Sequence, residues 1–131
     1  MSSASGSLEN FRTEIAAWVE ENCPASMRTP LPANEHPGGG KRAKYNNPDT
    51  KVWMDRMAAK GYTAPTWPTE YGGAGLGITE AVVLAHTIAR SGAGMSGASA
   101  VHLNLFGPNP IVIFGNEEQK SRFLPPLIKG Q

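Results

Sequence analysis

Apolar residues near the start of the chain repeat with the period of an α-helix. Five of them share a 3.6-residue spacing on one side of the segment: Leu8, Phe11, Ile15, Trp18 and Val19. Ser7 precedes this pattern as a plausible N-cap, and Pro24 follows Cys23 where a helix would have to stop. The pattern predicts a first helix from Ser7 to Cys23, whose apolar stripe needs a partner.

The next segment, residues 24–48, has little periodicity. It contains five prolines and three consecutive glycines, a composition that predicts a long surface loop. Asn47 can then cap a second helix that has Pro48 at its first position, and Gly61 suits the exit of that helix. Three residues give this helix an apolar face: Val52, Trp53 and Met57.

The apolar pattern is densest in the segment AVVLAHTIA, which spans residues 81–89. It predicts a third helix from Thr79 to about Arg90, with Glu80 in the first turn, where the helix dipole favours an acidic residue. Because this helix is apolar nearly all round, it is expected to be buried in a bundle or covered by something outside the chain.

The last third of the chain predicts three shorter segments. A helix is expected over about residues 98–106, and Asn109 can cap a following segment that has Pro110 at its first position and ends at Gly115. The β-branched residues of that segment also allow a short strand. Asn116 and Gln119 form a capping-box pattern for a last helix, which the pair Pro125 and Pro126 is expected to interrupt.

These elements predict an all-α fold, a small bundle of five or six helices around one core, with residues 1–131 forming a single domain. Twelve basic and eleven acidic residues give a net charge of +1, which argues against a nucleic-acid partner. The single cysteine excludes an intrachain disulfide and favours a reducing, cytoplasmic setting. No stretch approaches the ~18 apolar residues of a membrane span, and the N-terminus lacks a secretory pattern.

The glycine-rich segment at residues 72–77 has two interpretations, a phosphate-binding loop or a structural turn. Ile78 stands where the last glycine of a G-x-G-x-x-G pattern would have to be, and the prolines before the loop do not suit a strand. The structural turn is therefore favoured. Trp67 and Tyr71 beside the glycines could stack on a cofactor, although aromatic residues in such loops more often anchor the loop to the core.

Residues that could carry chemistry are few. No spacing links the histidines as metal ligands, and His86 is expected to be a hydrogen-bonded core histidine in the third helix. Three residues share one helical face at i, i+3 and i+7, where either a ligand pocket or the core would explain them: Ser99, His102 and Phe106. Glu117 and Glu118 are explained by the helix dipole, and no nucleophile with its base is apparent.

Three motifs, in order and with consistent spacing, give the chain a family resemblance. They are W-P-x-E-Y-G-G-x-G at residues 67–75, P-x-x-x-F-G-x-x-x-Q-K at residues 110–120 and L-P-x-L-x-x-G at residues 124–130. With these motifs the chain resembles the N-terminal helical domain of acyl-CoA dehydrogenases. The resemblance implies that the glycine loop is a turn between helices, and that Ser99, His102 and Phe106 line the acyl-chain pocket.

The resemblance also implies a function for a longer protein. Members of this family are FAD-dependent enzymes of fatty-acid and related acyl-CoA breakdown, which oxidise the Cα–Cβ bond of an acyl-CoA thioester. They pass electrons to an electron-transferring flavoprotein and form homo-oligomers. Their catalytic glutamate and nearly all FAD contacts lie in a β-domain and a C-terminal helical bundle, so this chain alone is expected to be an inactive, colourless fragment without catalytic, cofactor or metal residues.

Two alternatives remain at the level of the sequence. The chain could be a helical binding or assembly module without chemistry of its own, since it offers no acid, base or nucleophile in a catalytic arrangement. It could equally be the same domain of an acyl-CoA oxidase or a flavin monooxygenase, which share this domain.

Overall fold

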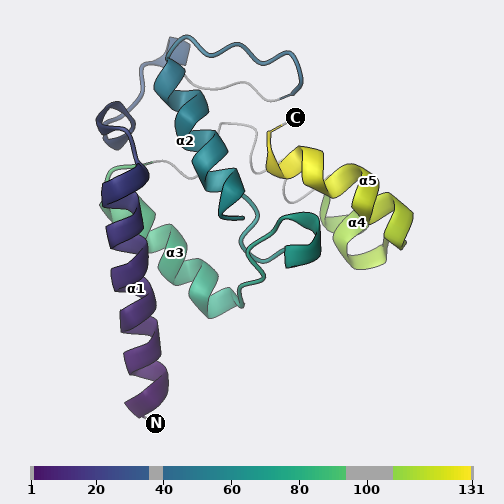
Figure 1. Ribbon diagram of the computed structural model, residues 1–131, viewed down its shortest axis with the longest axis horizontal. Helices are drawn as coiled ribbons and strands as arrows, with labels where there is room; N and C mark the ends of the chain where they lie inside the picture. The colour runs from purple at the N-terminus through teal and green to yellow at the C-terminus, as the bar shows by residue number, and fades with distance from the viewer. Residues whose placement is uncertain (1, 36–39, 94–107, 131) are drawn as a thin grey trace.

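The described part of the chain folds into packed helices (Figure 1). The computed structural model describes residues 2–35, 40–93 and 108–130. Its α-helices are α1 (Ser2–Asn22), α2 (Pro48–Ala59), α3 (Ile78–Arg90), α4 (Pro108–Phe114) and α5 (Glu117–Ile128), and its short 3₁₀ helices are η1 (Ala25–Arg28), η2 (Ala33–Glu35) and η3 (Thr69–Tyr71). Since these described ranges contain no strand, the all-α prediction is confirmed.

The first core lies where α1 packs along α3, with α2 beside them (Figure 1). At its centre are fully buried side chains of all three helices: Ile15, Met57, Leu84 and Ile88. Trp18 stacks at a tilt on Trp53, with 5.4 Å between ring centroids, and meets Tyr62 edge-on at 5.1 Å. The apolar stripes predicted for the first two helices therefore find their partners in each other and in α3.

A second core lies between the glycine loop and α5, which runs beside α4 in Figure 1. Its buried residues are Ala64, Trp67, Tyr71, Leu124 and Ile128. The prediction of a single core is wrong for the described residues, which form two clusters. The reason is that the aromatic residues of the loop pack on α5, and this gives the C-terminal helices a core of their own.

The predicted ends of α2 are confirmed. The side-chain oxygen of Asn47 accepts a hydrogen bond from the backbone N–H of Asp49 at 3.0 Å, Pro48 begins the helix, and Gly61 follows it with φ +74°. Trp53 and Met57 are buried as expected, whereas Val52 is 37% exposed and was wrongly placed on the buried face.

Three helices begin before their predicted first residues, and for α3 the difference is a single residue, Ile78 instead of Thr79. Helix α1 starts at Ser2, so Ser7 lies inside the helix and is not its N-cap. The small residues before Ser7 include no proline, and the helix can extend through them. Helix α4 begins at Pro108, before the expected Asn109 cap, and its β-branched residues adopt the helical alternative rather than the strand.

Helix α5 has the predicted capping box. The N–H of Gln119 donates to the Asn116 side chain at 2.9 Å, and the Asn116 N–H donates to the Gln119 side chain at 3.0 Å. Pro125 and Pro126 do not interrupt this helix, which continues to Ile128. The carbonyls that these prolines leave without a helical donor belong to residues 121 and 122, which are exposed, so water can satisfy them.

The segment between α1 and α2 is more than the predicted surface loop. It forms η1 and η2, and Met27 is buried in the first core. Arg28 donates to the carbonyls of Val19 and Glu20 at 3.1 and 3.0 Å, and thereby satisfies the C-terminal end of α1. The N–H of Gly40 donates to the carbonyl of Gly130 at 2.9 Å, so this segment also reaches the C-terminal region.

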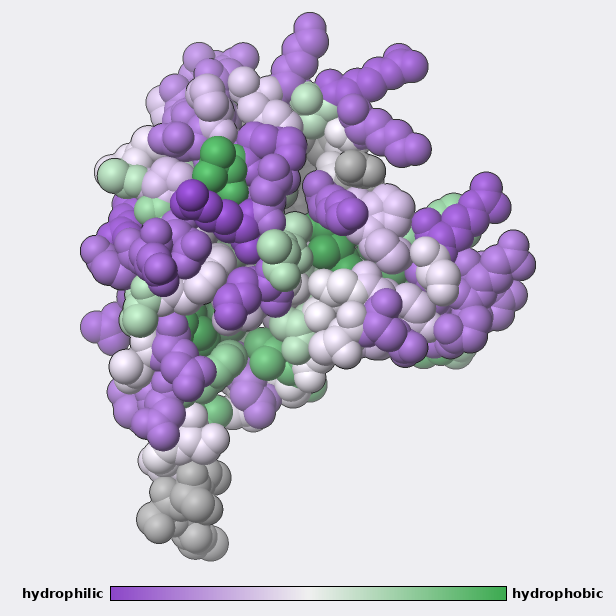
Figure 2. Space-filling model, in the orientation of Figure 1, coloured by the Kyte–Doolittle hydropathy of each residue, from purple (hydrophilic) through white to green (hydrophobic). Residues whose placement is uncertain are grey.

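Large apolar side chains are exposed on two helices, α3 and α4. Ile78 and Val82 are exposed on α3, and Ile113 and Phe114 are exposed on α4. Helix α3 is therefore not buried all round, because only one of its faces packs in the first core. Most of the face in Figure 2 is hydrophilic, with apolar areas scattered over it. No helix in the described ranges is long and apolar enough to cross a membrane.

Candidate functional site

The glycine loop follows a short 3₁₀ helix and is closed by its own backbone. Gly72 ends η3 in a left-handed conformation with φ +99°, which a residue with a side chain adopts only under strain. A Cβ atom on Gly73 would lie 2.2 Å from the carbonyl oxygen of Trp67, so only glycine permits this close approach. These two positions explain why glycines recur here without the spacing of a phosphate loop.

The backbone N–H groups of this loop point into the loop itself. The five consecutive donors at residues 72–76 pair with the carbonyls of Thr69, Pro68, Ala64, Trp67 and Pro65 at 2.9 to 3.3 Å. A phosphate cradle needs such N–H groups to converge on the anion instead. The interpretation of this loop as a structural turn is confirmed.

The two aromatic residues of the loop anchor it to α5. Trp67 and Tyr71 are each only 5% exposed, and both pack in the second core. Neither ring presents a free face on which a flavin could stack, and the loop amides are already paired. The glycine loop therefore does not fit a flavin site, and we assign no step of a reaction to it.

Tyr71 also makes a hydrogen bond that joins the loop to the start of α5. Its hydroxyl donates to the Oε2 atom of Glu117 at 2.6 Å, a short distance typical of a bond to a carboxylate. The pKa of Tyr71 is raised to about 12, mainly by this hydrogen bond to Glu117 and secondly by burial of the phenol. The phenol consequently stays protonated at neutral pH and acts as a donor rather than as a base.

The predicted pocket residues Ser99, His102 and Phe106 lie outside the described residues. Whether their side chains share one face toward a cleft remains a prediction. His86, by contrast, is described, and its expected place in the core is wrong, because it is exposed on the face of α3 opposite Leu84 and Ile88. There its Nδ1 atom lies 3.1 Å from the Nη1 atom of Arg12, which donates the hydrogen bond.

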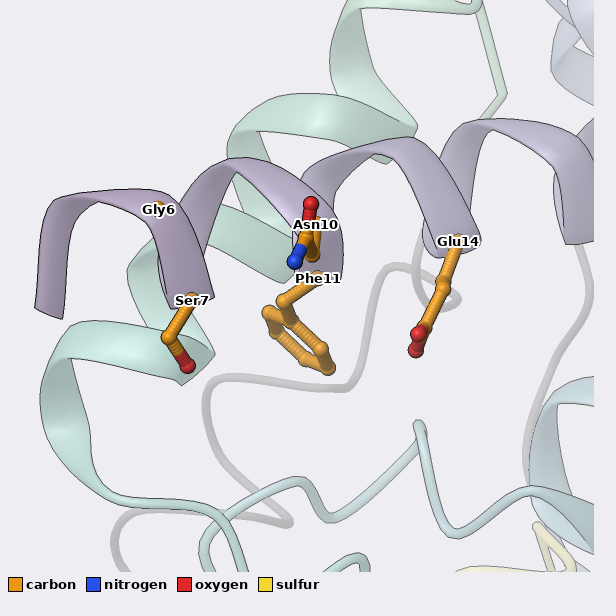
Figure 3. A pocket seen from close by; sticks show the side chains of 5 residues that line it. All are labelled: Gly6, Ser7, Asn10, Phe11 and Glu14. Carbon is orange, nitrogen blue, oxygen red and sulfur yellow. The ribbon is translucent and has the colours of Figure 1, made fainter. Parts of the chain in front are cut away.

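An open pocket of about 590 Å³ lies along the N-terminal half of α1 (Figure 3). Its lining among the described residues is Gly6, Ser7, Asn10, Phe11 and Glu14. The side chains of Ser7, Phe11 and Glu14 point to the same side of the helix in Figure 3. This lining contains one carboxylate, that of Glu14, and no second group that could exchange a proton with it. The pocket therefore offers a surface for contact and not a reaction centre.

Cys23 is no better suited to catalysis. Its side chain is buried, and its thiol lies 3.6 Å from the carbonyl oxygen of Pro24. Burial raises the pKa of the Cys23 thiol, an effect that the nearby Arg28 only partly opposes. Since the thiolate is the nucleophilic form, this environment disfavours nucleophilic attack.

The described residues thus define a small helical domain whose most distinctive loop has a structural role. The chain matches the family model for the acyl-CoA dehydrogenase N-terminal domain over residues 7–131. This match includes all three sequence motifs and the whole of the helical fold after the first turns of α1. The chain belongs to the acyl-CoA dehydrogenase family, as its N-terminal domain.

Curated relatives agree with this assignment. The chain is 30% identical over 118 residues to an acyl-CoA dehydrogenase, IpdE1, of Mycobacterium tuberculosis, covering 90% of this chain and 29% of the relative. It is 41% identical over 81 residues to the mitochondrial isovaleryl-CoA dehydrogenase of Bos taurus, covering 62% and 19%. It is 36% identical over 75 residues to an acryloyl-CoA reductase (NADH) of Anaerotignum propionicum, covering 57% and 18%. The chain therefore spans less than a third of each of these relatives.

Sequence reasoning missed the hydrogen bond between Tyr71 and Glu117. Glu117 has a sufficient local explanation in the helix dipole, and Tyr71 has one in the hydrophobic core. The two residues are separated by 46 positions, so no periodic pattern relates them. The only signal was that each residue lies within a family motif, Tyr71 in the first and Glu117 in the second.

Proposed function

We propose that this chain is the N-terminal domain of a flavoenzyme that dehydrogenates acyl-CoA thioesters between Cα and Cβ, and that it forms part of the acyl-chain pocket. The observation that carries the proposal is the family match over residues 7–131, which covers nearly the whole chain. The names of the relatives support a thioester substrate, since each contains an acyl-CoA or a specific CoA ester.

Within such an enzyme this domain supplies shape rather than chemistry. Ser99, His102 and Phe106 would line the pocket for the acyl chain, where the bulk of Phe106 would limit its depth. Apolar walls discriminate between acyl chains by about 1 to 3 kcal/mol per methylene, so this face would adjust specificity and not create the reaction. FAD, the catalytic glutamate and the CoA contacts would belong to other domains.

The wider role follows from the family resemblance. We place the enzyme in the breakdown of fatty acids or related acyl-CoA esters in the cytoplasm. It would act as a homo-oligomer and hand its electrons to an electron-transferring flavoprotein. The acryloyl-CoA reductase among the relatives also makes the direction of the reaction worth measuring.

The test uses the complete gene product that contains this domain. We expect the purified protein to carry flavin, and its flavin absorbance near 450 nm, roughly where flavins generally absorb, to bleach on anaerobic addition of an acyl-CoA. A panel of straight and branched acyl-CoA esters with a dye as electron acceptor would then give kcat/KM for each. The 131-residue chain alone serves as the inactive control.

Other outcomes separate the alternatives. Stoichiometric hydrogen peroxide in air would identify an oxidase, and oxygenation of a substrate would identify a monooxygenase. A gene product that carries no flavin and converts no acyl-CoA ester in either direction would contradict the proposal and favour the binding module.

A further inference from the structure

Two elements far apart in the sequence, η3 and α5, pack together in the second core and are also joined by a side-chain hydrogen bond. Tyr71 is the last residue of η3, and Glu117 is the first residue of α5. Their side chains join at 2.6 Å, with the tyrosine ring buried and the carboxylate at the surface. The bond therefore connects the buried glycine loop to the outer end of the C-terminal helices.

Local structure fixes both partners before they meet. The left-handed Gly72 turns the chain directly after Tyr71, and its N–H donates to the carbonyl of Thr69 at 3.0 Å. On the other side, the capping box of Asn116 and Gln119 sets the first turn of α5, where the helix dipole favours the carboxylate of Glu117. The backbones of both residues are thus already ordered, so the entropy lost when the bond forms is mainly that of the Glu117 side chain.

Helix α4 is joined to α5 by a short connection of two residues, Gly115 and Asn116. The N–H of Gly115 donates to the carbonyl of Ile111 at 2.8 Å, and a Cβ atom at Gly115 would lie 2.4 Å from that same oxygen. Ile111 and Val112 of α4 also pack on the second core. Since only Gly115 and Asn116 separate the two helices, the position of the first turn of α5 restricts where α4 can lie.

We infer that Tyr71 and Glu117 are a positioning pair, which holds α4 and the start of α5 in place against the glycine loop. The role of this pair in catalysis rests on the proposed function. Phe106 precedes the first residue of α4 by two positions, so the placement of α4 limits where this proposed pocket residue lies. The pair acts on acyl-chain selection through α4 and touches no substrate itself.

The experiment compares Tyr71→Phe and Glu117→Ala in the complete gene product, with Glu117→Gln as the variant that keeps an acceptor oxygen. Glu118→Ala, in the same exposed turn, is the matched control for the loss of charge. Tyr62→Phe is the control for the loss of a phenol, because no described residue hydrogen-bonds to the hydroxyl of Tyr62, a half-buried tyrosine of the first core.

The first measurement is hydrogen exchange of backbone amides. A hydrogen bond of this kind contributes about 1 kcal/mol, so Tyr71→Phe and Glu117→Ala should each speed exchange in residues 108–128 about fivefold, and leave α1 unchanged. Glu117→Gln should have a smaller effect. The double variant should resemble either single variant, because both remove the same bond.

The second measurement is the acyl-chain profile of kcat/KM. Tyr71→Phe should change the ratio between long and short acyl-CoA esters about threefold or more, and the two control variants should not. Unchanged exchange in residues 108–128 would overturn the positioning pair, even for a protein that converts no acyl-CoA. Faster exchange with an unaltered acyl-chain profile would overturn the role of the pair in acyl selection. A wild-type protein that turns over no acyl-CoA ester would overturn the proposed function instead.

Discussion

The two cores of this domain are built by different means. In the first, three α-helices supply most of the buried side chains, which repeat with helical period, and the connecting segments add Cys23, Met27 and Ala93. In the second, the loop that contains Trp67 and Tyr71 packs on a single face of α5. The helical repeat of apolar residues thus determines the first core. The second core depends instead on particular backbone conformations at prolines and glycines.

The cores also differ in how well they are covered. Helices α4 and α5 leave the apolar side chains of Ile113, Phe114 and Phe123 exposed beside the smaller second core. A region with fewer buried apolar groups opens locally at lower free energy than the rest of a protein. We therefore expect the α4–α5 region to open before the α1–α3 region does.

The largest expected effects come from truncating one fully buried leucine in each core. Leu84 and Leu124 are both 0% exposed, so Leu84→Ala and Leu124→Ala should each lower the free energy of unfolding by about 2 to 5 kcal/mol. Hydrogen exchange should show that Leu84→Ala weakens the whole domain, whereas Leu124→Ala weakens mainly residues 108–128. Equal loss of protection throughout the domain in both variants would show a single cooperative unit instead.

A methyl group at Gly73 tests whether backbone approach builds the second core. Its Cβ would lie 2.2 Å from the Trp67 carbonyl oxygen, so Gly73→Ala should destabilise the domain by about 1 to 3 kcal/mol. The matched control is Gly6→Ala in α1, where the added Cβ would meet no described atom within 4 Å apart from the backbone of its own helix. A denaturant titration in which both variants unfold like the wild type would show that the loop relaxes freely.

The two asparagine caps allow a smaller comparison between the regions. Asn47 caps α2 beside the first core, and Asn116 caps α5 beside the second. Asn47→Ala and Asn116→Ala should each cost about 1 kcal/mol, but only Asn116→Ala should speed exchange in α4, because it also disturbs Glu117. Identical exchange patterns in the two variants would argue against coupling between α4 and the capped turn.

The smallest expected effect is a pH dependence confined to alkaline solution. The hydrogen bond to Glu117, helped by burial and by the charges of Glu117 and Glu70, raises the pKa of Tyr71 to about 12 from its ordinary value near 10. Because the folded pKa is raised, this contribution is complete below pH ~10 and is lost as the pH rises to ~12. Burial also raises the pKa of Tyr62, so this second tyrosine contributes to alkaline unfolding in the wild type and in any Tyr71 variant alike.

For that reason the alkaline unfolding curve of the wild type is best compared with that of Tyr71→Phe. The difference in stability between the two proteins should be constant below pH ~10 and shrink between pH ~10 and pH ~12. A difference that is independent of pH over this range would show that Tyr71 does not titrate from a hydrogen-bonded state.

Features determined by neighbouring residues were predictable from the sequence. The Asn47 cap with Pro48, the Asn116 capping box and the turn at the glycines all depend on contacts within a few residues. The apolar faces of α1 and α2 were predictable for the same reason, apart from Val52. The resemblance carried by the three motifs then pointed to the family that the comparison shows.

Features determined by tertiary packing were not predictable in this way. His86 lies in an apolar segment, yet its exposure depends on which face of α3 meets α1. The continuation of α5 through Pro125 depends on exposed carbonyls that water can reach, and the division into two cores depends on the direction in which Trp67 points. The proposed pocket residues Ser99, His102 and Phe106 stay a prediction.

The most direct test of this domain's role is a single variant, Phe106→Ala, in the complete gene product. If Phe106 lines the acyl pocket, kcat/KM should shift toward longer or bulkier acyl-CoA esters, and the melting temperature should change little. If Phe106 is a core residue, its truncation should cost about 3 to 5 kcal/mol of stability. A large fall in Tm with an unaltered acyl-chain profile would contradict the assignment of this domain as a wall of the pocket.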